Sequence, residues 1–149
     1  LVGSEMCIRD SPDVDVAVLH SRDLGIDPLP WAQAPAQTGD DAMVMGFPHS
    51  GPFDAEMARV RDRITISGPD IYSHGRVERD SYTVRGKIQQ GNSGGPLVNT
   101  AGEVLGVVFG ASVDDSETGY ALTADEVNAQ IGDITQLTHP VDTGECVAH

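Results

Sequence analysis

The stretch of sequence that decides the fold is Gly91-Asn92-Ser93-Gly94-Gly95-Pro96-Leu97, in which a serine stands among glycines and an apolar run comes after it. Gly91 and Gly94 allow a tight, partly left-handed backbone that a Cβ atom would obstruct, so successive N–H groups can converge beside the serine hydroxyl. Such a pocket of N–H groups can hold an oxyanion. The pattern indicates an activated serine, although a serine between glycines can also be an ordinary tight turn.

The composition of the 149-residue chain indicates one all-β protein. Hydrophobic residues make up 39%, enough for a compact core, and 17 glycines and 9 prolines separate short Val, Ile, Thr and Tyr runs. The net charge of −14 would repel nucleic acids and anionic membrane surfaces, so we expect neither as a direct partner. No stretch approaches the roughly 18 apolar residues that a membrane-spanning helix needs.

The start of the chain stands apart from the rest. Residues 1–11 match neither the remainder of the chain nor a secretion signal, and we set them aside as a non-native leader. Cys7 lies in this leader and Cys146 lies near the other end, and two cysteines alone do not establish a disulfide. They lack zinc-site spacing, and we expect no metal and no cofactor.

Residues 12–38 are predicted to contain one strand and a linker. The strand is the apolar run Asp13-Val14-Asp15-Val16-Ala17-Val18-Leu19. The linker, 21–38, carries three prolines, which exclude both a strand ladder and a long helix. We expect Trp31 to pack this linker down.

Residues 39–131 are predicted to form a β-barrel closed by a short helix, and 132–149 an irregular tail. The predicted strands are 40–47, 57–66, 81–88, 97–99, 104–109 and 119–123, with a polar loop over 68–80 and a turn at 100–102. Thr123 and Glu126 have the spacing of a capping box, with Thr123 as the N-cap of the helix.

The serine stretch resembles the nucleophile loop of trypsin-like (chymotrypsin-fold) serine proteases, Gly-Asp/Asn-Ser-Gly-Gly-Pro, over six consecutive residues. Asp15 and the Val-Ala-Val-Leu after it resemble the family segment whose aspartate orients the catalytic histidine. Residues 104–111 and 114–124 are similar to actinobacterial membrane-anchored proteases of the MarP type. The resemblance spans about 12–146 and implies a chymotrypsin-like double β-barrel. This chain would hold the last strand of the first barrel and the complete second barrel.

This resemblance implies a serine endopeptidase that acts on proteins or peptides through an acyl-enzyme. Ser93 would be the nucleophile, Asp15 would orient the histidine, and the N–H groups of Gly91 and Ser93 would form the oxyanion hole. In this family the histidine precedes the aspartate, but all five histidines of this chain come after Asp15. His20 would point to the opposite face of the strand from Asp15. We therefore expect an N-terminally truncated protease that is inactive by itself.

The resemblance also implies a specificity pocket, a disulfide and a location. The pocket would lie around Lys87, Val108, Gly110, Gly119 and Ala121, and with no acidic residue at its base it would favour a small or medium apolar side chain. The neutral Asn92 cannot pair with a newly cut N-terminus, which argues against activation through that ion pair. Cys146 would pair with a cysteine outside this sequence. The whole protein would be extracytoplasmic, in the periplasm or cell envelope, anchored by membrane helices outside this sequence.

Two other interpretations compete with an enzyme. The chain could be a catalytically inactive module that keeps a peptide-binding groove, or a purely structural β-domain. Retention of both Ser93 and Asp15 argues against either, because neither role requires both residues.

Overall fold

The computed structural model describes residues 6–11, 13–21, 24–69 and 75–142 of the chain. These residues fall into two compact units. The first unit consists of Leu1–Asp27, Ser67–Glu78 and Asn128–His149, and the second of Pro28–Ile66 and Arg79–Val127.

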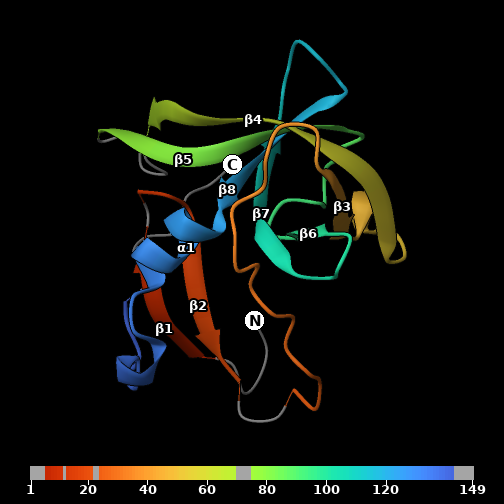
Figure 1. The fold of residues 1–149 in the computed structure, drawn as a ribbon. Coiled ribbons are helices and arrows are strands. Elements are labelled where there is room, and N and C mark those ends of the chain that lie inside the picture. Colours follow the sequence, from red (N-terminus) through yellow and green to blue (C-terminus); the bar gives the residue numbers. More distant parts are fainter. Residues whose placement is uncertain (1–5, 12, 22–23, 70–74, 143–149) are drawn as a thin grey trace. The chain divides into compact units, whose positions relative to one another are not determined.

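Six antiparallel strands form a closed barrel in the order β3-β4-β5-β8-β7-β6 (Figure 1). They are β3 (Asp41–Gly46), β4 (Asp54–Pro69), β5 (Arg76–Gly86), β6 (Pro96–Asn99), β7 (Val104–Ala111) and β8 (Thr118–Thr123), followed by helix α1 (Ala124–Ile131). Short 3₁₀ turns lie at η1 (Pro48–Ser50) and η2 (Ile134–Gln136). The all-β prediction is confirmed.

The predicted polar loop over 68–80 is wrong at both ends. β4 continues to Pro69 and β5 already begins at Arg76, while 70–74 lie outside the described residues. Arg76 and Glu78 are exposed on either side of the half-buried Val77. A strand with one solvated face carries polar residues at alternate positions, so polarity alone did not mark a loop.

The barrel core lies in the second unit and is made by the inward face of each strand. Val44 and Val84 are completely buried, as is Leu97. The burial of β3 alternates regularly, with Ala42, Val44 and Gly46 turned inward. This alternation is the period of two that side chains adopt along a strand, and it lets the strand next to the serine stretch take a single register.

The linker is attached to the barrel mainly by its main chain. The N–H of Ala32 donates to Val104 O at 2.9 Å, and the N–H of Val104 donates to Pro30 O at 2.8 Å. The N–H of Ala36 donates to the buried Tyr82 hydroxyl at 3.0 Å. Trp31, expected to pack the linker down, is half-buried and makes a parallel bridge with Val104.

The first unit contains an antiparallel hairpin of β1 (Met6–Ser11) and β2 (Val16–His20), with a register shift between Cys7 and Arg9. Ser11 Oγ donates to Gln130 Oε1 at 2.9 Å. Residues 6–11 thus take part in a sheet, although the sequence led us to leave 1–11 out of the fold. The non-native origin of that segment stays a prediction.

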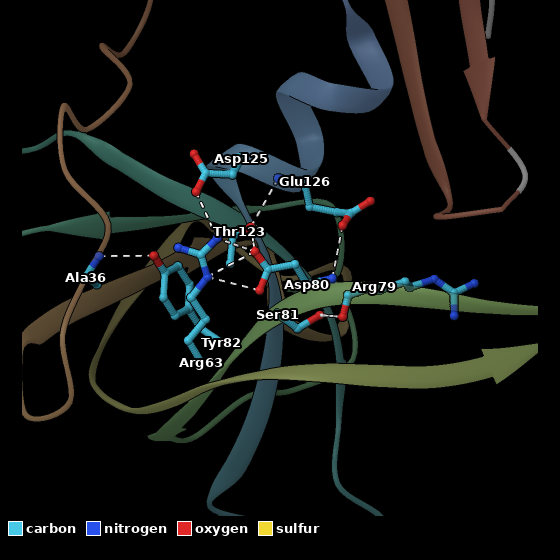
Figure 2. Close-up of polar contacts among 9 residues, drawn as sticks. All are labelled: Ala36, Arg63, Arg79, Asp80, Ser81, Tyr82, Thr123, Asp125 and Glu126. Atoms are coloured by element: carbon cyan, nitrogen blue, oxygen red, sulfur yellow. Dashed lines mark hydrogen bonds and ion pairs between the residues drawn. The ribbon is translucent and has the colours of Figure 1, made fainter.

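An ionic network joins β4, β5, β8 and α1 in the second unit (Figure 2). Arg63 Nε donates to both carboxylate oxygens of Asp80 at 3.0 Å, and Arg63 Nη2 donates to Asp125 Oδ2 at 2.8 Å. The Thr123 hydroxyl donates to Asp80 Oδ2 at 3.1 Å and accepts the N–H of Glu126 at 3.1 Å. The predicted N-cap is therefore present. The Glu126 carboxylate accepts the N–H of Asp80 at 3.0 Å.

The network shifts the titration of its members. The hydrogen bond from Arg63 holds the pKa of Asp80 below its ordinary value of 3.8 against the opposing effect of burial, and Thr123 adds to the lowering. The same contact, together with Asp125, raises the pKa of Arg63. Both side chains are partly exposed, 37% for Arg63 and 30% for Asp80, so solvent screens their attraction.

We expect Asp80→Asn to lower the free energy of unfolding by about 1 kcal/mol at neutral pH, because charge-assisted hydrogen bonds to Arg63 are lost. The carboxylate pKa is lowered in the folded state, so its stabilisation is present above pH 3.8 and disappears as the pH falls through the folded-state pKa. Urea unfolding of the two proteins at pH 7 and pH 2 measures this. Asp41→Asn, which breaks the exposed pair with Arg59, is the matched control and should cost less. A deficit for Asp80→Asn that is the same at both pH values would contradict the expectation.

Candidate active site

The serine stretch forms a double turn between β5 and β6. The N–H of Asn92 donates to Gln89 O at 3.0 Å, and the N–H of Gly95 donates to Asn92 O at 2.9 Å, so the two turns bracket Ser93. Gly91 and Gly94 take the left-handed conformation, with φ values of 99° and 83°. The conformational role predicted for these two glycines is therefore what the structure shows.

The main chain of β7 holds one side of this double turn. The N–H of Gly94 donates to Val108 O at 2.7 Å, and the N–H of Val108 donates to Gly95 O at 2.9 Å. Ser93 is exposed, and its hydroxyl lies 3.5 Å from Phe109 O, a long hydrogen bond. The serine is thus fixed by its backbone while its hydroxyl stays accessible to solvent.

Two N–H groups of the double turn have no acceptor among the residues that the structure describes. Within the part of the chain that the structure describes, the N–H groups of Gly91 and Ser93 make no hydrogen bond. These are the two donors that the sequence assigned to the oxyanion hole. A pair of free, rigidly held N–H groups beside a hydroxyl is what a tetrahedral oxyanion needs, because no reorganisation is required when the charge develops.

Turn η1 supports the other side of the double turn, and sequence reasoning missed it. The N–H of His49 donates to Gln90 O at 2.8 Å, and the N–H of Phe47 donates to Gly91 O at 3.4 Å. The His49 ring Nε2 lies 3.0 Å from Gln89 Oε1. His49 and Ser50 are left-handed at φ of 55° and 57°, a strained conformation for residues with a Cβ. The only sign of this turn in the sequence is that Pro48 and His49 lie in a segment rich in turn-forming residues.

Asn92 points inward. It is 1% exposed, and its Oδ1 has no hydrogen-bond partner among the described residues. A buried amide oxygen without a partner costs about 1–3 kcal/mol. A carboxylate at the same place would bury a charge at greater cost unless a cation paired with it. The neutral side chain that the sequence shows suits this environment.

The residues predicted to shape a specificity pocket do not share one environment. Val108 and Ala121 face each other across β7 and β8, and both side chains belong to the barrel core, so they could shape a pocket only through their main chain. A side chain at Gly119 would clash with Ile88, whereas Gly110 has open space beside it. Lys87 lines a different groove, together with Arg59 and Glu117. The sequence predicts that these residues lie on neighbouring strand segments, but it does not show to which face of the barrel each side chain points.

Asp15 and Ser93 belong to different units. Asp15 is exposed in the turn before β2 with a φ of 61°, in the first unit, and Ser93 lies in the second. Their catalytic pairing stays a prediction. His20 ends β2, and His139 contacts the Thr138 hydroxyl at 2.9 Å, while His74 and His149 lie outside the described residues.

Cys7 is a free thiol whose Sγ donates to Arg9 O at 3.2 Å. Cys146 lies outside the described residues, so its disulfide stays a prediction. Among the residues that are described, no group of three or more His, Cys, Asp or Glu side chains is arranged to hold a metal ion. The described helices include none with the length and apolar character to cross a membrane.

A model of the trypsin-like peptidase domain family matches residues 2–107. The chain belongs to this family. A serine protease of Mycobacterium tuberculosis, Rv3671c, is 52% identical over 138 residues, covering 92% of this chain and 34% of the relative. The crystal structure of Rv3671c protease in its active form superposes with a TM-score of 0.91 at 50% identity, over 97% of this chain and 63% of that one. The predicted resemblance to MarP-type proteases is confirmed.

Weaker similarities are found to a further sequence and to a further structure, and the latter shows the same fold. Protease Do-like 2 of Arabidopsis thaliana chloroplasts is 32% identical over 116 residues, which cover 74% of this chain and 18% of that protein. A structure of the HtrA-type protease AlgW with a tripeptide has a TM-score of 0.73 at 21% identity, covering 89% of this chain and 44% of AlgW. This chain spans about a third of the length of the Mycobacterium relative.

We expect Gly91→Ala to slow reaction of Ser93 with an active-site-directed fluorophosphonate by about 100-fold or more, the effect of losing one oxyanion donor. The added methyl group would clash with Phe47 O and turn the Gly91 N–H away. Labelling rates of the full-length protein measure this. Gly102→Ala is the matched control, since Gly102 is also left-handed, at φ of 82°, but has open space around it. Equal labelling of the two variants would contradict this role for Gly91.

Proposed function

We propose that this chain supplies the nucleophile and the oxyanion hole of a serine endopeptidase. The observation that carries the proposal is the exposed Ser93 hydroxyl beside two N–H groups, of Gly91 and Ser93, that have no acceptor in the described part of the chain. Membership of the trypsin-like peptidase family supports it. The substrates are proteins or peptides.

The reaction runs through an acyl-enzyme. Ser93 Oγ attacks the peptide carbonyl carbon while an imidazole takes its proton, and the oxyanion accepts hydrogen bonds from Gly91 and Ser93. The C–N bond then breaks, and the imidazole returns the proton to the leaving amine. Water attacks the acyl group and restores the serine. Asp15 orients the imidazole of a histidine that precedes it in the full-length protein.

The acyl side of the substrate runs along β7, and its first side chain is small or medium-sized and apolar. Support for this comes from Ile88, which is buried in the core cluster against Gly119 and leaves little depth there. The nearby acidic residues are engaged at the surface, since Asp115 accepts from the Thr118 hydroxyl and Glu117 pairs with Arg85. None of them provides a buried negative charge for a basic substrate side chain.

The full-length protein is proposed to act outside the cytoplasm, in the periplasm or cell envelope, with this domain held near the membrane by helices outside this sequence. A disulfide through Cys146 belongs to the same proposal. The similarity to the MarP-type proteases supports all three points, and the net charge of −14 fits a domain that does not itself bind an anionic membrane.

We expect Ser93→Ala to abolish fluorophosphonate labelling of the full-length protein, and Asp15→Asn to lower peptide hydrolysis by about 10⁴-fold through loss of the correct imidazole tautomer. Gel-based labelling and hydrolysis of a quenched peptide library measure the two effects. Asp13→Asn is the matched control for Asp15→Asn and should leave hydrolysis unchanged. Labelling that persists in Ser93→Ala would exclude Ser93 as the nucleophile. A wild-type protein that binds peptides without cleaving them would favour the inactive binding module.

The 149-residue chain by itself should hydrolyse no peptide, because none of its five histidines precedes Asp15. The same quenched library tests it, with the full-length protein as the positive control. Turnover by the isolated chain that Ser93→Ala removes would show that another residue acts as the base.

A further inference from the structure

The peptide group between Gln90 and Gly91 connects turn η1 to the two free N–H groups beside Ser93. A trans peptide is planar, so its C=O and its N–H point in opposite directions and turn together. Gln90 O accepts the N–H of His49 at 2.8 Å, whereas the Gly91 N–H of the same peptide group has no acceptor in the described part of the chain. The bond from His49 on one side of this peptide group therefore fixes the direction of the free N–H on the other side.

The ring of His49 contacts the same segment one residue earlier. Its Nε2 lies 3.0 Å from Gln89 Oε1, and because a carboxamide oxygen can only accept, the ring nitrogen is the donor. Gln89 O in turn accepts the N–H of Asn92 at 3.0 Å, which closes the first of the two turns around Ser93. His49 thus holds both residues that lead into the serine stretch, Gln90 by its main chain and Gln89 by its ring.

His49 makes these contacts from a left-handed backbone, with φ of 55° and ψ of 31°. Glycine adopts this conformation freely and asparagine tolerates it, whereas it is unfavourable for most other residues and most of all for β-branched ones. The His49 side chain is exposed, so burial of the ring does not account for the conformation. A residue held in such a conformation by its surroundings points to a use for the backbone direction, and here that direction aims its N–H at Gln90 O.

We propose that His49 is a positioning residue of the endopeptidase, which keeps the Gln90–Gly91 peptide turned so that the Gly91 N–H faces the developing oxyanion. The inference rests on the proposed endopeptidase function and names a further residue for it. His49 acts through Gln90 and Gly91 and takes no proton in the reaction. Because negative charge develops on the substrate oxygen only as Ser93 attacks, the effect belongs to the transition state. Loss of this positioning should lower kcat and leave KM nearly unchanged.

Three substitutions of His49 in the full-length protein separate the role of its backbone from that of its ring. His49→Gly keeps the left-handed backbone and its N–H but lacks the ring, and kcat for a quenched peptide should fall by about three- to tenfold, the effect of one neutral hydrogen bond. His49→Asn should lie close to His49→Gly. His49→Val disfavours the left-handed backbone, and kcat should fall by about 100-fold or more, the effect of losing an oxyanion donor. KM should change by less than about twofold in all three variants.

A second substitution tests the ring contact independently. Gln89→Met removes the acceptor and keeps a side chain of similar length, so it should lower kcat as much as His49→Gly does. The double variant should lose no more than either single variant, because both remove the same hydrogen bond. His139→Gly is the matched control, since the His139 ring also makes one hydrogen bond at the surface, 2.9 Å from the Thr138 hydroxyl. It should leave kcat and KM unchanged.

Equal kcat in the wild type, His49→Gly and His49→Val would overturn the inference, because the Gly91 N–H would then not depend on His49. Losses that add in the double variant would contradict a shared contact between His49 and Gln89. Urea unfolding of each variant shows whether it is folded. If His49→Val does not fold, the comparison of His49→Gly, Gln89→Met and the double variant decides the matter. If the wild-type protein neither hydrolyses peptides nor reacts with a fluorophosphonate, the proposed function itself is wrong, and the inference fails with it.

Discussion

The position of Ser93 depends on the left-handed backbone of Gly91, whose carbonyl is bonded by Phe47 next to turn η1. At a φ of 99° the Gly91 carbonyl accepts from Phe47 while its N–H points away from every acceptor in the described part of the chain. A β-carbon there would meet Phe47 O, so only glycine permits this close approach. The direction of one N–H bond, and with it the oxyanion hole that we propose, therefore rests on the absence of a side chain.

Support for the serine turn comes from two separate elements, strand β7 and turn η1. The main chain of β7 holds Gly94 and Gly95 through Val108. On the other side, the N–H of His49 in turn η1 holds Gln90, the N–H of Phe47 just before the turn holds Gly91, and the His49 ring contacts Gln89 Oε1. Because these bonds set the position of the Ser93 hydroxyl and of the two N–H groups beside it, a change in either support should alter the geometry of the proposed site.

Much of this could be predicted from the sequence, since it depends on local patterns. Short Val, Ile, Thr and Tyr runs between glycines and prolines predicted the barrel strands, and the spacing of Thr123 and Glu126 predicted the N-cap that the Thr123 hydroxyl forms. The contacts that support the serine turn could not be predicted in the same way. His49 and Gln89, for example, are distant in sequence and meet only because of the barrel register. The face that a side chain takes also depends on the barrel register. Val108 and Ala121 were therefore predicted to line a pocket, although the pleat turns their side chains into the core. Long polar strand ends such as Arg76–Glu78 resemble loops, because solvent accepts polar residues in either conformation.

In the proposed reaction, oxyanion binding and proton transfer need different kinds of group, and a turn of a β-barrel is suited to the first of them. Backbone N–H groups fixed by a closed ladder are ideal oxyanion donors, each contributing about 3 kcal/mol to lowering the barrier, and they need no ionisable side chain. Proton transfer is different, because it needs a group with a pKa near neutrality within hydrogen-bond reach of the serine. The described contact of Ser93 Oγ is with Phe109 O, an acceptor that cannot take the proton at neutral pH, and its length of 3.5 Å marks it as weak. The serine hydroxyl is therefore only weakly bonded and is readily available to a stronger base, as the nucleophile role that we propose for it requires.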